Sequence, residues 1–161
     1  MLYCTFIQLY GVQPMQVTYL GNSTSLNQSL KIPLFHEAVS AGFPSPAQDY
    51  IEQELDLNQL CIQRPAATFF VRVSGESMID AGIHDGDILV VDRSIQEAHG
   101  DIVVASLDGD LTVKLLEVEP LPRLVPCNSQ YSPIEVSESS ELTVLGVVTH
   151  VVRNVRGNRR S

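Results

Sequence analysis

The sequence of 161 residues has few basic side chains, no tryptophan and no long apolar run. Ten lysines and arginines stand against nineteen aspartates and glutamates, so the formal net charge is −9. This charge repels a phosphate backbone, and direct DNA binding is not expected. No apolar run approaches the roughly 18 residues of a membrane span. The apolar start has no basic residue before Lys31, which argues against a secretory signal. These absences predict a cytoplasmic protein without membrane contact.

Cysteine is also scarce, and the three cysteines are Cys4, Cys61 and Cys127. Their odd number and wide spacing favour neither a disulfide framework nor a zinc site, and they agree with a reducing compartment. No metal-ligand spacing occurs, so neither a metal nor a cofactor is expected. One cluster of basic residues lies near the end of the chain, and it consists of Arg153, Arg156, Arg159 and Arg160. We interpret it as a solvated tail, with a nucleic-acid contact as the alternative.

The chain divides into three parts by composition. Residues 1–48 are predicted to form a flexible arm, because residues 21–29 are polar and lack periodicity. Residues 49–155 are predicted to form a β domain, and residues 156–161 a basic tail. A short helix is expected after the arm: Ser45 can cap it, Pro46 suits its first position, and an apolar stripe runs from Tyr50 through Leu55.

From Thr68 onward, short runs rich in Val, Ile, Leu and Phe alternate with turn residues, which is typical of successive strands. Six strands are predicted, over residues 68–74, 88–93, 101–107, 111–119, 123–126 and 142–155. Asp108-Gly109 predicts a type I′ hairpin between the third and fourth strands. The short connections favour a mainly β fold with a curled, largely antiparallel sheet. The last strand is interpreted as an edge that could pair subunits.

A candidate nucleophile, Ser77, follows the first of these six strands. Gly75 allows a sharp bend there, which could expose the Ser77 hydroxyl and let the amides of Glu76 and Ser77 converge on an oxyanion. An ordinary turn or a helix cap would explain the same residues.

Lys114 is the candidate general base, on the second strand of the predicted hairpin. Both faces of that strand are mainly apolar, and partial desolvation would lower the lysine pKa toward the neutral amine that a base requires. The alternative is a lysine whose ammonium reaches water. A Ser-His-Asp triad stays open as well, because triad members occur in different chain orders; the histidines available to it are His36, His84, His99 and His150.

Several ordered blocks of this sequence resemble the LexA and UmuD family of self-cleaving peptidases. The shared blocks are Ser-Gly-Glu-Ser-Met at 74–78 and the segments 86–92, 100–103 and 112–114. The segments 42–47, 56–60, 128–134 and 146–148 are similar to the UmuD branch in particular. The resemblance covers residues 31 to 155, and it is specific because the blocks occur together and in order.

The resemblance implies a self-cleavage reaction with named parts. By this resemblance, Ser77 would be the nucleophile and Lys114 the general base. The cut falls between Ala41 and Gly42. The residue types suit these roles, since a small Ala41 fits a narrow pocket and Gly42 allows the backbone to approach closely.

The resemblance also implies a role in a bacterial cytoplasm. A RecA filament on single-stranded DNA stimulates cleavage, and loss of residues 1–41 produces the accessory subunit of a UmuC-like error-prone translesion DNA polymerase in the SOS response. The protein forms a homodimer. A different hypothesis is a binding module without proteolytic activity, which regulates the assembly of the polymerase or of the RecA filament.

Overall fold

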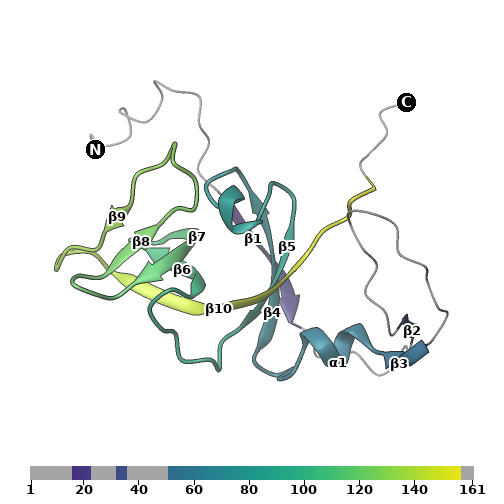
Figure 1. Ribbon diagram of the computed structural model, residues 1–161. Helices are drawn as coiled ribbons and strands as arrows, with labels where there is room; N and C mark the ends of the chain where they lie inside the picture. Colours follow the sequence, from purple (N-terminus) through teal and green to yellow (C-terminus); the bar gives the residue numbers. More distant parts are fainter. Residues whose placement is uncertain (1–15, 23–31, 36–50, 157–161) are drawn as a thin grey trace.

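A computed structural model of the chain describes residues 16–22, 32–35 and 51–156 (Figure 1). Strands dominate these residues, and helix is limited to two short segments. The elements are β1 (Gln16–Asn22), β2 (Ile32–Phe35), β3 (Ile51–Leu55), α1 (Leu57–Cys61), β4 (Thr68–Ser74), the 3-10 turn η1 (Ile79–Ala81), β5 (Ile88–Asp92), β6 (Ile102–Leu107), β7 (Asp110–Glu117), β8 (Arg123–Val125), β9 (Ile134–Glu135) and β10 (Leu142–Val152).

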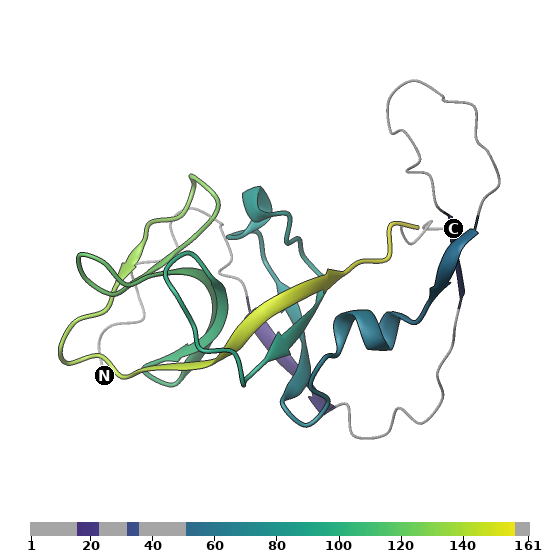
Figure 2. The same ribbon diagram turned by 60° about the horizontal axis from the view of Figure 1, so that its bottom comes forward.

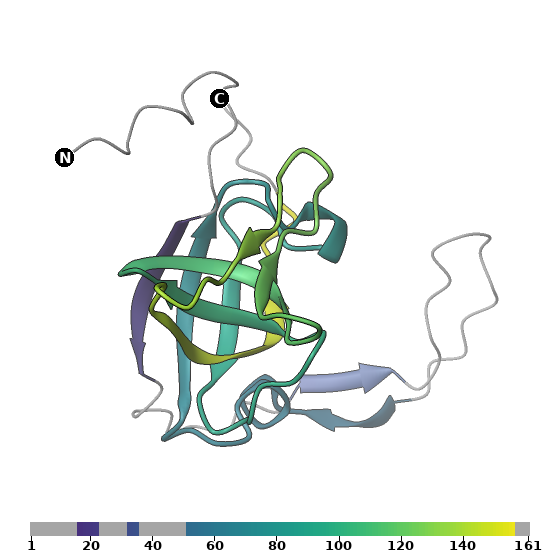
Figure 3. The same ribbon diagram turned by 90° about the vertical axis from the view of Figure 1, so that its left-hand side faces the viewer.

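The main sheet has the strand order β1-β4-β5-β10-β6-β7-β8-β9, and every neighbouring pair is antiparallel. The sheet curls, so that β1 also approaches β7 across its interior (Figure 3). The predicted mainly β fold is confirmed, and the six predicted strands occur with ends that differ by at most three residues. β1 lies within the predicted arm and was not among the predicted strands.

The hairpin between β6 and β7 forms as predicted. Asp108 has φ 53° and Gly109 has φ 91°, and the strands pair up to Leu107 and Asp110. Positive φ at both central positions is the requirement of a type I′ turn. The hairpin sets the register that places Lys114 opposite Val103.

β10 crosses the middle of the sheet and changes partners along its length (Figure 2). Residues 142–147 pair with β6, and residues 147–152 pair with β5. β10 is therefore interior in the strand order, yet each of its halves pairs on one side only among the described residues. Its pairing between subunits stays a prediction. Gly146 permits the crossing, because a Cβ atom there would lie 2.8 Å from the Asp92 carbonyl oxygen.

The helix expected to follow Pro46 is wrong over residues 51–55. These residues form β3, which pairs with β2 through Ile32 and Leu55 at one end and Phe35 and Ile51 at the other. Helix capping is a local signal, and it cannot report a strand partner that lies almost twenty residues earlier. The helix α1 begins at Leu57, where Asp56 caps it by accepting a 2.8 Å hydrogen bond from the Asn58 amide. Residues 45–50 lie outside the described residues.

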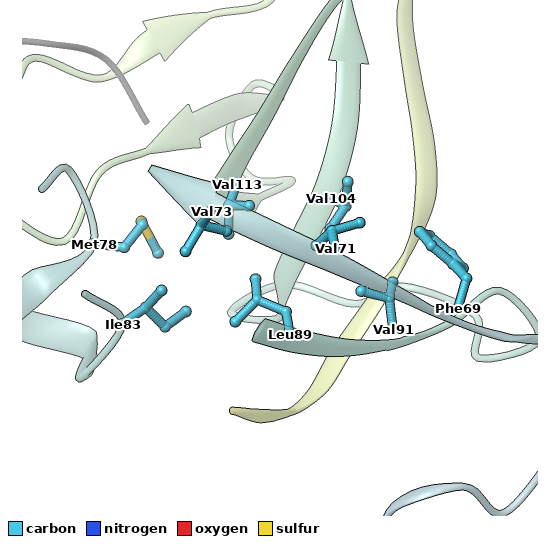
Figure 4. Packing of buried hydrophobic residues seen from close by; sticks show 9 residues of the cluster. All are labelled: Phe69, Val71, Val73, Met78, Ile83, Leu89, Val91, Val104 and Val113. Atoms are coloured by element: carbon cyan, nitrogen blue, oxygen red, sulfur yellow. The ribbon is translucent and has the colours of Figure 1, made fainter. Parts of the chain in front are cut away.

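Apolar side chains pack on both faces of the central strands. One cluster, shown in Figure 4, joins side chains of β4 to β7 to the loops after β4: Phe69, Val71, Val73, Met78, Ile83, Leu89, Val91, Val104 and Val113. A second cluster is formed by Val103, Ala105, Leu116, Leu124 and Val147. β6 and β7 contribute to both clusters, and Lys114 on β7 is buried although it is charged or polar at either protonation state.

Arg153 follows β10 and does not behave as part of a solvated tail, so that interpretation is wrong for this residue. Its Nε and Nη2 atoms donate to the two carboxylate oxygens of Asp87 at 2.7 and 2.5 Å, and Nη2 also donates to the Gly82 carbonyl at 2.5 Å. Asp87 is only 1% exposed and also accepts from the His84 amide. The hydrogen bond from Arg153 holds the Asp87 pKa below its usual value of 3.8. The pair therefore fastens the end of β10 to the loop before β5.

Replacing Arg153 with alanine is expected to lower the melting temperature by several degrees at pH 7. The variant leaves the Asp87 carboxylate buried without its cation, which is costly. Because the folded-state pKa of Asp87 is depressed, the stabilisation is present above pH 3.8 and is lost as the pH falls below it. Arg64→Ala is the matched control, since Arg64 pairs with Asp92 at 3.3 Å but is more exposed. Thermal unfolding followed by circular dichroism measures the melting temperatures. Equal values for Arg153→Ala and wild type would contradict the prediction.

Candidate active site

Ser77 lies in the tight turn that follows β4. Gly75 has φ 95°, and its amide donates to the Asp85 carboxylate at 2.9 Å. The Glu76 carbonyl accepts from the Ile79 amide at 3.3 Å, which closes the turn before η1. Ser77 is fully buried, so the expectation that the bend exposes its hydroxyl is wrong. The turn points this side chain toward the sheet interior instead of toward solvent.

Lys114 reaches Ser77 from β7. Its Nζ atom lies 3.0 Å from Ser77 Oγ, 2.9 Å from Thr112 Oγ1 and 2.9 Å from the Val113 carbonyl oxygen. The side chain is only 5% exposed. The alternative of a lysine extending into water is therefore wrong. The structure brings together a hydroxyl and an amine that are 37 residues apart in the sequence.

Burial lowers the pKa of Lys114 from 10.5 to about 8, and the nearby Cys127 thiol acts weakly in the opposite direction. The contacts of Nζ suit the neutral amine. Two N–H bonds can serve Thr112 Oγ1 and the Val113 carbonyl, and the lone pair remains for the Ser77 hydroxyl proton. The arrangement can therefore remove a proton from Ser77, which is what nucleophilic attack by a serine requires.

The histidines do not supply a competing base within the described residues. The His99 ring accepts from the Val118 amide, the His150 ring contacts Thr149, and none of His84, His99 and His150 hydrogen-bonds to Ser77. His36 lies outside the described residues. No cluster of metal-ligating side chains occurs in the part of the chain that the structure describes, nor does that part contain a helix long and apolar enough to cross a membrane. Cys61 and Cys127 are free thiols.

The two amides predicted to bind an oxyanion lie in different surroundings. The Ser77 amide makes no hydrogen bond to another described residue. The Glu76 backbone hydrogen-bonds with Tyr131, an interaction that lowers the Tyr131 pKa while burial raises it more strongly. The Glu76 backbone thus has a partner in the loop after β8, whereas the Ser77 amide has none among the described residues.

Asn128 is a site residue to which the sequence reasoning gave no role. Its Nδ2 atom donates to the Glu76 carbonyl at 2.8 Å, and its Oδ1 atom accepts from the Gln130 amide at 3.0 Å. The side chain is buried. The segment 128–134 had entered only as a block of family resemblance. A buried asparagine in a loop gives no sequence signal of what it contacts 52 residues away.

The predicted cleavage site, Ala41 and Gly42, lies outside the described residues. Along the chain it falls between β2 and β3, whose pairing brings Phe35 opposite Ile51.

A mainly β fold with a buried serine–lysine pair defines a class of serine peptidase, and comparisons with known proteins agree. A model of the family described as peptidase S24-like matches residues 33–149. Protein ImpA of Escherichia coli is 54% identical over 124 residues, which span 77% of this chain and 85% of ImpA. Protein MucA of Escherichia coli is 47% identical over 129 residues, spanning 80% of this chain and 88% of MucA. The LexA repressor of Vibrio campbellii is 38% identical over 130 residues, spanning 80% of this chain and 62% of the repressor.

The chain belongs to the peptidase S24-like family, as a UmuD-type member of the LexA and UmuD group of self-cleaving serine peptidases.

Proposed function

We propose that this protein cleaves its own chain between Ala41 and Gly42, with Ser77 as nucleophile and Lys114 as general base. The observation that carries the proposal is the 3.0 Å contact between Lys114 Nζ and Ser77 Oγ in a buried setting. A lysine with a pKa of about 8 supplies a fraction of neutral amine near physiological pH and can act as a base toward serine, whereas a solvated lysine stays protonated.

The reaction has two stages. Lys114 Nζ takes the Ser77 hydroxyl proton as Oγ attacks the Ala41 carbonyl carbon, and the Ser77 amide, with that of Glu76, stabilises the oxyanion. The intermediate collapses, the bond to the Gly42 nitrogen breaks, and Lys114 returns the proton to the departing amine. Water then attacks the ester between Ser77 and Ala41, with Lys114 again accepting a proton, and releases residues 1–41.

The chain's own segment is the substrate, so the reaction gains from proximity. The similarity to ImpA, MucA and LexA supports the proposal that another molecule stimulates cleavage and that the cleaved product acts on a partner protein. In this proposal, a RecA filament on single-stranded DNA promotes cleavage, the protein acts as a homodimer, and residues 42–161 become the accessory subunit of a UmuC-like error-prone DNA polymerase. The acidic body argues against direct DNA binding.

The test is the intact mass of purified protein after incubation at pH 9. Two products are expected, with the masses of residues 1–41 and 42–161, because most Lys114 side chains are neutral at that pH. Ser77→Ala should remain at full mass, which excludes a contaminating protease. An uncut wild type, or a cut at another position, would refute the proposal.

A mutagenesis assay in cells separates proteolysis from mere binding. If cleavage carries the function, Ser77→Ala should abolish damage-induced mutagenesis, and a chain supplied as residues 42–161 should restore it. If Ser77→Ala is as active as wild type, the function belongs to a binding module whose cleavage machinery is idle.

A further inference from the structure

The loop that follows β8 holds the nucleophile turn through its backbone. Asn128 Nδ2 donates to the Glu76 carbonyl at 2.8 Å, and the Asp80 amide donates to the Cys127 carbonyl at 2.9 Å. These two hydrogen bonds lie on either side of Ser77 in the sequence. Glu76 also hydrogen-bonds through its backbone with Tyr131, in the same loop. The turn that carries Ser77 is therefore attached to residues 127–131 at both ends.

The orientation of the Asn128 side chain is determined by its two partners. Oδ1 accepts from an amide N–H, that of Gln130, and Nδ2 donates to a carbonyl, that of Glu76. The reversed amide would place two donors together and two acceptors together, so the observed orientation is strongly favoured. The Tyr131 amide donates to the Asn128 carbonyl at 3.1 Å, which closes the turn. A buried, doubly bonded side chain of this kind is a rigid support.

Holding the Glu76 carbonyl has a consequence for the next amide. In a planar trans peptide, the C=O of one residue and the N–H of the following residue point in opposite directions. With the Glu76 carbonyl directed at Asn128, the Ser77 N–H is directed away from the loop. That N–H makes no hydrogen bond to another described residue, which leaves it available to a negatively charged oxygen.

The same loop is connected to the general base. β8 pairs with β7 through Val125 and Leu115, the neighbour of Lys114, and Asn128 lies three residues beyond the end of β8. Asn128 is thus the side chain by which the loop after the neighbouring strand β8 holds the Glu76 carbonyl, next to the nucleophile.

We propose that Asn128 is a positioning residue for self-cleavage, which aims the Ser77 amide at the developing oxyanion by holding the Glu76 carbonyl. The proposal rests on the proposed function. It predicts that removing the Asn128 donor slows the chemical step without changing the protonation of Lys114.

Two variants test this in the full-length chain. Asn128→Ala removes both hydrogen bonds of the side chain. Asn128→Asp keeps the shape and the acceptor for the Gln130 amide, but it replaces the donor to Glu76 with an acceptor oxygen and adds a negative charge. Asn154→Ala is the matched control, because Asn154 Oδ1 likewise accepts from the amide two residues later, Arg156, at 3.0 Å.

Self-cleavage is measured as a function of pH, below the unfolding temperature of each variant. The maximal cleavage rate of both Asn128 variants should fall at least about tenfold. This loss is smaller than the 10²- to 10³-fold loss that follows removal of an oxyanion donor, because the Ser77 amide is still present and is only less well aimed. Asn154→Ala should match wild type. For Asn128→Ala the midpoint of the profile should stay at about pH 8, because the surroundings of Lys114 are intact.

Two outcomes would overturn the proposal. The first is cleavage by both Asn128 variants within twofold of the wild-type rate. The second is a loss of rate in Asn128→Ala accompanied by a midpoint that moves up toward 10.5, which would mean that the pocket has loosened and hydrated Lys114. Asn128→Asp adds a charge that itself raises this midpoint, so only its maximal rate is compared.

A second readout separates this proposal from the proposed function. A small fluorophosphonate forms a bond from Ser77 Oγ to phosphorus while fluoride leaves, and its P=O oxygen needs the same amide. If wild type does not cut itself, the proposed function fails, yet labelling of Ser77 still reports on Asn128. At least tenfold slower labelling of both Asn128 variants supports positioning, and equal labelling refutes it.

Discussion

Replacing Lys114 with methionine should abolish self-cleavage at every pH while leaving the stability of the folded protein at neutral pH close to that of wild type. Methionine has a similar length but no basic nitrogen, so the Ser77 hydroxyl loses its only contact with a base among the described residues. The expected loss of rate is on the order of 10⁴-fold or more, as for removal of a member of a catalytic unit.

The depressed pKa explains why stability changes little at neutral pH. Below about pH 8 the folded state holds a buried ammonium, and lowering the pKa from 10.5 to about 8 corresponds to a cost of about 3 kcal/mol. Methionine removes this cost, but it also removes the hydrogen bonds to Ser77, Thr112 and Val113, worth about 1 kcal/mol each. The two effects offset each other, and a stability close to that of wild type is expected at pH 7.

The stability of wild type should exceed that of Lys114→Met as the pH rises. Between about 8 and 10.5 the unfolded state binds more protons at this lysine than the folded state does, so the free energy of unfolding increases with pH. Urea unfolding of wild type and Lys114→Met at pH 7 and at pH 10 measures the free energy of unfolding on either side of this range. Lys31→Met, at the chain's other lysine, is the control for a lost charge. A Lys114→Met variant that cuts itself, or a stability difference that does not change with pH, would contradict this account.

The rate of self-cleavage by wild type should rise with pH and level off above about pH 8. Only the neutral amine accepts the Ser77 proton, and burial places its pKa at about 8. The neutral fraction falls tenfold for each pH unit below that value, so the rate at pH 6 should be about one hundredth of the maximum.

The groups around Lys114 determine how sharp this profile is. Among the described residues, Cys127 is the group with a resolved electrostatic effect on Lys114, and the pKa of Cys127 itself is raised by burial and by Asp80. Cys127 is therefore largely a neutral thiol over the pH range in which the cleavage rate rises. Single-turnover rates from pH 5.5 to 10 test the prediction, with each histidine replaced by glutamine in turn as a control. A midpoint near 6.5 that disappears in one histidine variant would identify histidine as the base instead.

Much of the sheet was predictable because strand signals are local. The runs at 68–74 and 88–93 alternate with turn residues, and Asp108-Gly109 accepts positive φ whatever surrounds it. The candidate side chains, Ser77 and Lys114, were predictable as well, although local reasoning left an ordinary turn, a solvated lysine and a histidine triad open. The family resemblance was needed to choose among these.

Tertiary structure decided what depends on partners distant in sequence. Residues 51–55 follow a helix-like pattern, yet pairing with β2 makes them a strand. Arg153 looks like part of a basic tail until Asp87, 66 residues earlier, is placed against it. The role of Asn128 depends on a carbonyl 52 residues away.

The sequence by itself determined six of the strands from Thr68 onward and the types of reactive side chains, since these depend on neighbouring residues. Only the folded chain determined that an amine and a hydroxyl 37 residues apart lie 3.0 Å from each other. It also excluded water from around them, and the pKa of Lys114 follows from that exclusion, because the energy of a charge is set by everything that surrounds it.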